Sequence, residues 1–363
     1  MPKADPAEQA LIDLIAGFRH DPHGFVLAAF PWGEPGQLAK EEGPREWQVE
    51  ILKYIGQRLK EGATIAQAAA DAIQAAIASG HGIGKSALVS WIILWAMSTC
   101  PNTRGVVTAN TEAQLRTKTW PEVKKWHNLA INRHWFTCAA TSLHAIGEAE
   151  KTWRIDAIPW SENNTEAFAG LHNKGSRILV VFDEASAVSD KIWEVTEGAL
   201  TDEQTEIIWC VFGNPTRNTG RFRECFGRLG HRWFHRSIDS RTVQGTNKSQ
   251  IQKWVDDYGE DSDFVRVRVR GLFPMSGTMQ LIASDVVTAA TKAVSTATLR
   301  DPVVLGVDVA RAGEDETVIW ARRGNDARTI PPMIYRGRDT MVTVGNVAAL
   351  ANKWQAQAIY VDE

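Results

Sequence analysis

A glycine-rich segment at residues 79–86, SGHGIGKS, constrains the possible fold more than any other feature of the sequence. The apolar segment ALVSWIILWAM follows it directly, which is typical of a glycine loop that opens into a helix. In such a loop, backbone N–H groups surround a phosphate, the lysine reaches the β- and γ-phosphate oxygens, and the next hydroxyl binds Mg²⁺. The residues expected to contact a nucleotide are Gly80, His81, Gly82, Ile83, Gly84, Lys85 and Ser86, with Ser86 also a Mg²⁺ ligand.

The match to the phosphate-loop template is imperfect. The template has a glycine where Ser79 stands, and the preceding segment DAIQAAIAS is rich in alanine, so its propensity permits a helix as well as a strand. The alternative interpretation is a glycine-rich turn that binds no ligand.

A second segment supports the phosphate-loop interpretation. Residues 178–182, ILVVF, form an apolar run typical of a buried parallel strand, and Asp183 and Glu184 follow at its carboxyl end, where α/β proteins place their sites. We expect Asp183 to hold Mg²⁺ and Glu184 to orient and polarise an attacking water, because hydrolysis needs a positioned base. A strand ending in Asp-Glu is common by itself, but downstream of a GKS sequence the pair predicts an ATPase.

Two further segments fit the same site. The segment PREWQ begins an amphipathic helix, and the amide of Gln48 could read adenine through two hydrogen bonds; a plain helix start with Trp47 in the core is the alternative. The buried strand EIIWCVF ends in GNPT, where Asn214 or Thr216 could contact the γ-phosphate and couple its loss to movement. An ordinary Asn-Pro turn is the alternative there.

Composition limits the class of protein. The 363 residues, 44% of them hydrophobic, are enough for two domains. No segment reaches the roughly 20 uncharged apolar residues of a membrane span, and the first residues lack the order of a secretory signal, so we expect a cytoplasmic protein without a membrane partner. The four cysteines form no C-x-x-C pair, which argues against zinc, redox chemistry and disulfides.

The net charge of −3 means that nucleic-acid binding would need a local patch. Residues 216–241 contain seven arginines and only two acids, with aromatic residues that include Phe222, Trp233 and Phe234 between them. Arginine suits phosphate contacts, and a solvated charged surface is the alternative.

Changes in sequence pattern predict four parts of the chain. Residues 1–44 are an N-terminal arm with one amphipathic helix, and residues 45–275 are an α/β domain with a mostly parallel sheet, including a lid-like subdomain at about 216–275. Residues 276–300 are a linker, and residues 301–363 begin a second α/β pattern. Because the sequence stops after an apparent central strand, IYVDE, we expect a fragment of a longer protein.

The order of these motifs, PREWQ, GHGIGKS, VVTANTEAQLRTKTW, ILVVFDEAS, FGNPT, DFVRVRVRGLFP and LGVDVARAGEDET, resembles the terminase large subunits of tailed bacteriophages and prophages from about Arg45 onward. The resemblance implies a RecA/ASCE-like P-loop ATPase followed by part of an RNase H-like nuclease. It also implies ATP and Mg²⁺ as cofactors, Mg²⁺ or Mn²⁺ at the nuclease site, and double-stranded DNA, a procapsid portal protein and a small terminase subunit as partners of a homo-oligomeric ring, pentameric in this family.

By this resemblance, Gln48 corresponds to the adenine reader, Lys85 and Ser86 to Walker A, Asp183 and Glu184 to Walker B with its catalytic acid, and Asn214 to the coupling motif. One position departs from the family pattern. Many terminases have an arginine in the loop where this chain has His81, and a histidine is a poor substitute for a permanent cation. We therefore expect a neighbouring subunit to supply the arginine; the candidates are Arg217, Arg221, Arg266, Arg268 and Arg270.

Acidic residues of the second pattern suggest a two-metal nuclease site. Asp308 ends the run VVLGVD, and a first-strand aspartate is the usual anchor of such a site. The resemblance places the second acid at Asp362, with Glu363 as the fallback, Asp315 as an auxiliary metal ligand, and a third family acid beyond the given sequence. Without the resemblance, a lone strand aspartate would fit actin-like and sugar-kinase folds as well.

The sequence is compatible with three functions. The first is a DNA-packaging ATPase with a metal-dependent endonuclease, whose cutting would be impaired in this fragment. The second is a helicase-like or remodelling P-loop ATPase without nuclease activity. The third, a small-molecule kinase, is disfavoured because Glu184 suits the activation of water and no acceptor site is evident.

Overall fold

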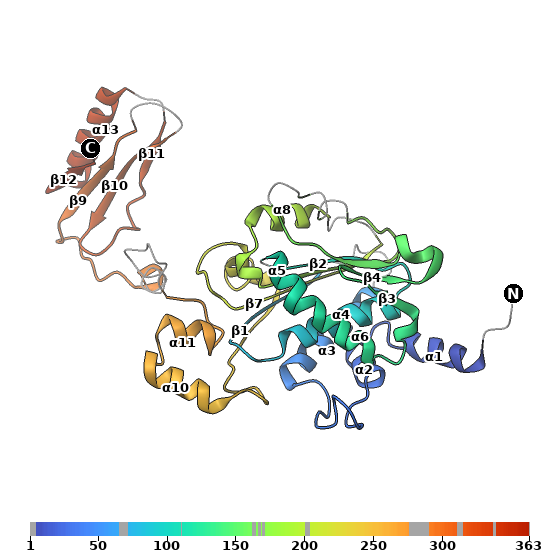
Figure 1. Cartoon of the computed structure of the whole chain (residues 1–363). Helices are drawn as coiled ribbons and strands as arrows, with labels where there is room; N and C mark the ends of the chain where they lie inside the picture. Colours follow the sequence, from blue (N-terminus) through green and yellow to red (C-terminus); the bar gives the residue numbers. More distant parts are fainter. Residues whose placement is uncertain are drawn as a thin grey trace. The chain divides into compact units, whose positions relative to one another are not determined.

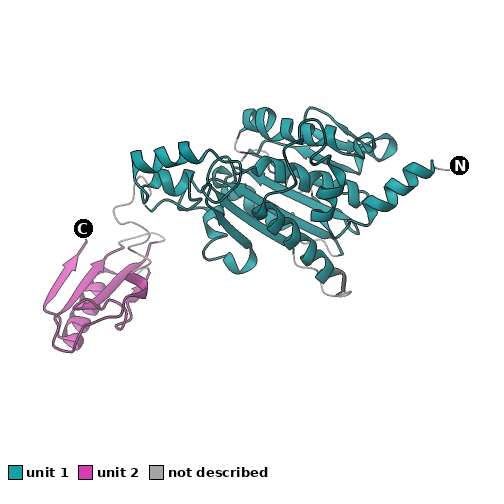
Figure 2. Cartoon of the chain, turned by 90° about the horizontal axis from the view of Figure 1, so that it is seen from below, with its two compact units in different colours: residues 1–284 teal, residues 285–363 magenta. Residues whose placement is uncertain are grey.

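The structure, a computed structural model, describes residues 5–64, 72–109, 111–161, 165, 168, 171–199, 204–275, 290–310, 315–336 and 339–362. The chain divides into two compact units, residues 1–284 and 285–363 (Figure 2). The division falls inside the predicted linker, 276–300.

Unit 1 contains the sheet on which β1, β2, β3, β4 and β7 are labelled in Figure 1. It has eight strands in the order β3-β4-β5-β2-β6-β7-β1-β8. The strands are β1 Ile73–Ser79, β2 Arg104–Thr108, β3 Phe136–Cys138, β4 Ser142–Ala145, β5 Arg154–Ala157, β6 Arg177–Asp183, β7 Glu206–Gly213 and β8 Phe234–Ile238. Along the sheet from β5 through β2, β6, β7 and β1 to β8, every pair of neighbouring strands is parallel. Strands β3 and β4 add an antiparallel edge. Strand β7 lies between β1 and β6, which is the order of RecA/ASCE-like P-loop ATPases.

Helices cover both faces of this sheet. The α-helices of unit 1 are α1 Pro6–Ala16, α2 Pro22–Ala29, α3 Glu46–Thr64, α4 Lys85–Thr99, α5 Glu112–Gln114, α6 Trp120–Leu129, α8 Asp190–Ala199, α9 Arg221–Glu224, α10 Lys248–Tyr258 and α11 Asp263–Arg268. Alternate residues of β1 and β6 enter two separate cores, one built with α1 to α4 and α6, the other with α8 and α9. A strand buried on both faces needs apolar residues at every position, and all seven residues of β6 are buried.

The segment predicted to be an N-terminal arm packs into the larger core. Ile15 of α1 and Phe25 and Val26 of α2 are almost fully buried there. The Trp95 indole N–H of α4 donates to the Phe18 carbonyl at 2.9 Å. The described part of residues 1–44 is therefore integral to unit 1.

Unit 2 contains a four-stranded sheet and the helix α13. The bounds are β9 Val303–Asp308, β10 Thr317–Arg323, β11 Met333–Tyr335, α13 Thr340–Trp354 and β12 Ala358–Val361. The strand order is β11-β10-β9-β12; β9, β10 and β11 are antiparallel neighbours, and β12 runs parallel to β9. This order and these directions fit the first four strands of an RNase H-like domain. Within the described residues, no helix is long and apolar enough to cross a membrane.

All four cysteines are free thiols. Three of them, Cys100, Cys210 and Cys225, are buried, and Cys138 is half-buried. Burial raises the pKa of the Cys138 thiol to about 11 and that of Cys210 to about 12, so both are protonated at neutral pH.

A buried ion pair joins the start of β6 to that of β7. The Arg177 side chain is fully buried, lies over the Trp95 ring and donates to Glu206 Oε2, with a shortest N–O distance of 2.6 Å. Glu206 also accepts from Arg19 at 3.0 Å. Burial acts to raise the pKa of Glu206, but Arg177 and Arg19 outweigh it and lower that pKa below its usual value of 4.5.

We predict that Glu206→Gln destabilises unit 1 more than Arg177→Met does. The first change leaves a buried guanidinium without its anion, which costs about 3–5 kcal/mol, whereas the second leaves Glu206 paired with Arg19. Urea unfolding followed by tryptophan fluorescence measures both. Because the folded pKa of Glu206 is lowered, the difference between wild type and Glu206→Gln should be full above pH 4.5 and shrink as pH falls further. Equal losses for the two variants would contradict this account.

Candidate active site

The predicted glycine loop connects β1 to α4 and needs its glycines. Gly82 and Gly84 have φ values of +75° and +85°, in the left-handed region that favours glycine. At Gly80 a Cβ atom would lie 2.3 Å from the Val269 carbonyl oxygen, so no side chain fits. Ser79 is an ordinary β1 residue whose hydroxyl donates to the Gly80 carbonyl at 3.0 Å, which explains why this chain needs no glycine there.

Four consecutive loop carbonyls point outward and accept hydrogen bonds. The donors are Ser240 Oγ to His81 at 2.8 Å, Arg45 Nη1 to Gly82 at 3.2 Å, Trp47 Nε1 to Ile83 at 3.1 Å and Gln48 Nε2 to Gly84 at 2.9 Å. Within the described residues, the N–H groups of Gly82, Ile83 and Gly84 have no hydrogen-bond partner. They form a concave set of donors at a helix N-terminus, an arrangement that binds phosphate.

Gln48 connects the glycine loop to the start of α3 by hydrogen bonds of its side chain. Its side chain is only 2% exposed, and its Oε1 accepts from the backbone N–H of Arg45 at 2.8 Å while its Nε2 bonds the loop. This is the reach-back bond of a capping box at the start of α3. In this structure, Gln48 therefore holds the loop to α3, and its reading of adenine stays a prediction.

Lys85 and Asn214 meet at the centre of the site. The Lys85 ammonium donates to Asn214 Oδ1 at 3.1 Å, and Asn214 Nδ2 donates to the Ser79 carbonyl at 2.6 Å. Loss of solvent lowers the pKa of Lys85, while the carboxylates of Glu184 and Asp183 act in the opposite direction. The strand ends of β1, β6 and β7 therefore converge on this lysine, as the sequence predicts for parallel strands.

Asp183 ends β6 and is 5% exposed. Its Oδ1 accepts from the Glu184 N–H at 3.1 Å, and its Oδ2 accepts from Thr119 Oγ1 at 2.6 Å. Burial raises the pKa of Asp183, and the Thr119 hydrogen bond opposes this effect. Within the described residues the Ser86 hydroxyl has no hydrogen-bond partner. An aspartate and a free hydroxyl beside a phosphate cradle are oxygen ligands of the kind that Mg²⁺ takes.

Glu184 has an unusual backbone conformation. Its φ is +54° and its ψ is +46°, a left-handed conformation that costs a non-glycine residue on the order of 1–3 kcal/mol and concentrates at functional sites. The turn is tightly packed, because a Cβ atom on Gly213 would lie 3.0 Å from the Ala185 backbone nitrogen. The strained turn sets the direction in which the Glu184 carboxylate leaves β6.

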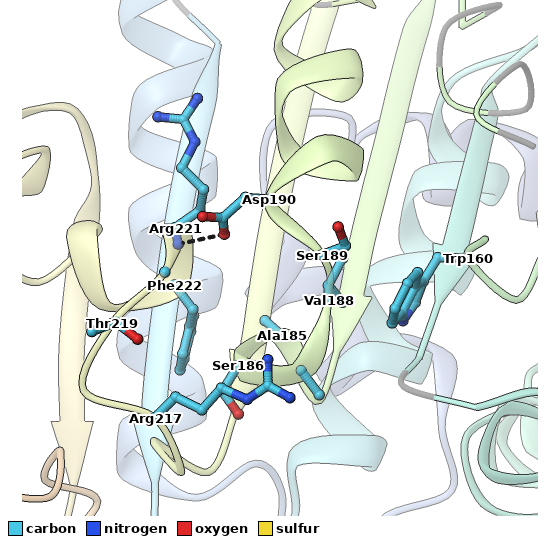
Figure 3. Close-up of a pocket in the computed structure, with 12 residues that line it drawn as sticks. Trp160, Ala185, Ser186, Val188, Ser189, Asp190, Arg217, Thr219, Arg221 and Phe222 are labelled. Carbon is cyan, nitrogen blue, oxygen red and sulfur yellow. Dashed lines mark hydrogen bonds between the residues drawn. The ribbon is translucent and has the colours of Figure 1, made fainter. Parts of the chain in front are cut away.

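The hydroxyl groups of Ser186 and Thr216 link the turn after Glu184 to the segment that follows β7. Ser186 Oγ donates to the Asn214 carbonyl at 2.8 Å and lies 2.8 Å from Thr216 Oγ1. Beyond it lies a cavity of about 550 Å³, which Arg217, Phe222 and Trp160 help to line (Figure 3). The segment expected to sense the γ-phosphate is thus joined directly to the turn that follows Glu184.

The five candidate arginines lie in different surroundings. Arg268 Nη1 is 3.4 Å from His81 Nε2, at the phosphate loop of the same chain. Arg221 pairs with Glu197 at 2.7 Å, Arg270 pairs with Asp261 at 3.0 Å, and Arg266 donates to the Phe273 carbonyl at 3.1 Å. Arg217 is exposed and has no ion pair within the described residues.

His81 itself is not a cation at neutral pH. Desolvation lowers its pKa, and the positive charges of Lys85 and Arg268 add to the effect. The same chain therefore provides a permanent cation, Arg268, beside the position where the family has its loop arginine. Donation of an arginine by a neighbouring subunit stays a prediction, and Arg217 is the candidate with a free guanidinium.

Most arginines of the 216–241 segment are engaged by acids far away in the sequence. Arg221 and Arg232 contact Glu197, and Arg236 contacts Glu50. Arg228 pairs with Glu224 at 2.9 Å, and Arg241 pairs with Asp239 and Glu260. The structure favours a surface of paired charges over a patch of free cations.

Unit 2 brings two of the predicted nuclease acids together. Val361 pairs with Val307 on parallel strands, and the Asp362 N–H donates to the Val307 carbonyl at 2.9 Å, so Asp308 and Asp362 follow neighbouring strand ends. Asp315 precedes β10, and no group of three or more metal-binding side chains occurs among the described residues. Glu363, the fallback acid, lies outside the described residues.

Thr119 is the site residue that sequence reasoning missed. It lies inside a helical pattern, RTKTW, where a threonine carries no local signal of function. Ser240 and Trp47, which hold the loop carbonyls, were likewise not predicted for that role. Only their position in the fold identifies them.

Comparison with known proteins finds a similar curated protein. The probable terminase large subunit of enterobacteria phage P7 is 30% identical over 257 residues, which are 67% of this chain and 51% of the relative. The chain thus spans about half the length of the curated relative that it matches. No family model matches the chain.

Matches among solved structures include two large terminases. One, from a thermophilic bacteriophage and in complex with ADP, is 13% identical, with coverage of 84% of this chain and 76% of that chain and a TM-score of 0.45. The Thermus phage P74-26 large terminase ATPase domain is 15% identical, with coverage of 58% and 92% and a TM-score of 0.38. Because these values are low, the assignment rests on the sequence match. The chain is therefore a relative of the terminase large subunits of bacteriophages.

Proposed function

We propose that unit 1 binds ATP with Mg²⁺ and hydrolyses it, and that hydrolysis drives double-stranded viral DNA into a procapsid. One observation supports the ATPase above all others. The free N–H groups of the glycine loop, the Lys85 ammonium, and the Asp183 and Glu184 carboxylates converge at the carboxyl edge of one parallel sheet. A cradle for phosphate, a metal ligand and a base for water are the parts that hydrolysis requires.

The loop would bind the β-phosphate and Lys85 would bridge to the γ-phosphate. Lys85 would then exchange its hydrogen bond with Asn214 for phosphate oxygens, which frees Asn214 Oδ1. Ser86 and Asp183 would hold Mg²⁺, which neutralises phosphate charge. A change at Asn214 would pass to Ser186, because Ser186 Oγ bonds the Asn214 carbonyl.

Glu184 would accept a proton from the attacking water as it aligns with the γ-phosphate. Its strained backbone and its position after a buried strand hold the carboxylate without help from a long side-chain network. Arg268 Nη1 lies 3.4 Å from His81 Nε2, so this cation of the same chain is placed beside the loop, where it would stabilise the charge that develops on the phosphate.

The wider role rests on the similarity to terminase large subunits. We propose that the protein acts in the host cytoplasm as a homo-oligomeric ring, with the portal protein, the small terminase subunit and DNA as partners. We also propose that Asp308, Asp362 and Asp315 belong to a nuclease site for Mg²⁺ or Mn²⁺ that cuts concatemeric DNA. Asp308 and Asp362 lie on neighbouring strands, which supports this proposal.

We predict that Glu184→Gln keeps nucleotide affinity but slows ATP hydrolysis by about 100-fold or more, because it removes the base and leaves the phosphate cradle intact. Lys85→Ala should weaken binding and turnover together, by about 2–4 kcal/mol in transition-state terms. Calorimetry with ADP and a phosphate-release assay measure the two effects. The control is Glu194→Gln, an exposed glutamate of α8, which should behave as wild type. Wild-type turnover by Glu184→Gln would show that Glu184 does not activate the water.

We predict that this chain cuts plasmid DNA poorly with Mn²⁺, because two-metal cutting needs several converging acids and no group of three or more metal-binding side chains comes together within the described residues. Any residual cutting should disappear in Asp308→Ala and survive in Lys85→Ala, the control that disables only the ATP site. The measurement is nicking and linearisation on an agarose gel. Cutting that persists in Asp308→Ala would place the nuclease site elsewhere or favour an ATPase without one.

A further inference from the structure

Thr119 makes a long-range contact with the proposed Mg²⁺ ligand. It is fully buried, and its Oγ1 lies 2.6 Å from Asp183 Oδ2, although 64 residues separate the two. A hydroxyl that donates to a carboxylate forms a short, charge-assisted hydrogen bond. Asp183 Oδ1 accepts from the Glu184 N–H, so each carboxylate oxygen has one fixed donor and the group cannot rotate freely.

A π-helical turn places Thr119 at this position. The turn, Leu115–Thr119, interrupts the helix between α5 and α6, and the Trp120 N–H bonds the Leu115 carbonyl five residues earlier. Such a turn adds one residue to the helix, which shifts every later side chain around the axis, and it is frequent at functional sites. Without it, Thr119 would face a different direction.

The flanking residues fix this turn in the core. Leu115 and Trp120 are 1% and 3% exposed, and both belong to the larger core of unit 1. The Trp120 indole N–H donates to the Ala139 carbonyl at 2.9 Å, which locks the start of α6. Thr119 is thus held by packing on both sides and is a rigid donor to Asp183.

The loop does not itself orient Asp183 in this structure. Ser86, the expected Mg²⁺ ligand on α4, has no hydrogen-bond partner within the described residues, so its hydroxyl is available to a metal. The contact with the Asp183 carboxylate comes instead from Thr119, at the start of the neighbouring helix α6.

We propose that Thr119 is a positioning residue, which orients the Asp183 carboxylate toward the Mg²⁺ of a bound nucleotide. This inference rests on the proposed function of the same site. The π-helical turn contributes to this role, because the turn determines which side chain reaches Asp183. Thr119 would touch neither nucleotide nor metal, so its removal should change metal dependence more than phosphate binding.

The test compares Thr119→Val, which removes the hydroxyl at nearly constant volume, with Thr119→Ser, which keeps it. The control is Thr196→Val, because Thr196 is also fully buried but its hydroxyl bonds only the Ile192 carbonyl of its own helix, at 2.7 Å. ADP affinity is measured by calorimetry in EDTA and across a series of Mg²⁺ concentrations. Should Thr119→Val fail to fold, Thr119→Ala takes its place.

Thr119→Val should need roughly 10-fold more Mg²⁺ for half of the Mg²⁺-dependent gain in ADP affinity, the size expected for one charge-assisted hydrogen bond. Its affinity in EDTA should equal that of wild type, and Thr119→Ser and Thr196→Val should show wild-type Mg²⁺ dependence. An unchanged Mg²⁺ dependence in Thr119→Val, or an equal loss with and without Mg²⁺, would overturn the inference. Wild-type protein that binds no ADP at any Mg²⁺ concentration would instead overturn the proposed function on which it rests.

Discussion

The outward bonding of the glycine-loop carbonyls is the constraint on which the site depends. A peptide unit has its N–H and C=O on opposite sides, so fixing successive carbonyls outward leaves the N–H groups facing inward. The donors come from the start of α3 and from the segment after β8, which are remote from the loop in sequence. The loop is therefore preorganised by the surrounding fold before any phosphate arrives, and ligand binding need not order it.

Charge is distributed around this loop so that a phosphate can enter. Lys85 is desolvated and is stabilised by the carboxylates of Asp183 and Glu184, which also need a cation nearby. A triphosphate would be an alternative partner for Lys85, and a metal would be one for Asp183. The positive charge of Lys85 and the negative charges of Asp183 and Glu184 thus offset one another, and the same groups would bind a nucleotide and a metal. The Glu184 backbone is strained in this arrangement.

Local sequence was sufficient to predict β6, β7 and the residues at their ends, whereas the alanine-rich segment of β1 permitted a helix as well. Strands β6 and β7 are buried on both faces, so residues 178–182 and 207–212 are apolar runs, and the polar residues at the carboxyl ends meet at one edge. The glycine positions followed for the same reason, because backbone geometry leaves no room for a side chain. The strand order of both units agrees with the fold class that the motif order implied.

The remaining features depend on contacts between distant residues. Thr119 contacts Asp183 only because a π-helical turn changes the direction of its side chain. A hydrophobic pattern in the sequence does not reveal such a change in helix register. From the sequence, the arginines of 216–241 suggest a free basic patch. In the structure, Glu50, Glu197 and Glu260 form ion pairs with several of them. Likewise, no sequence signal showed that the first 44 residues belong to the main core.

A crystal structure of this chain with Mg²⁺ and a non-hydrolysable ATP analogue would test the central claim most directly. The account predicts that the β-phosphate accepts hydrogen bonds from the N–H groups of Gly82, Ile83 and Gly84, and that the metal contacts the hydroxyl of Ser86 on the side of Asp183. The loop carbonyls should keep the outward hydrogen bonds of the ligand-free structure. A triphosphate bound elsewhere, or a loop that must rearrange and break those bonds to bind it, would contradict the account.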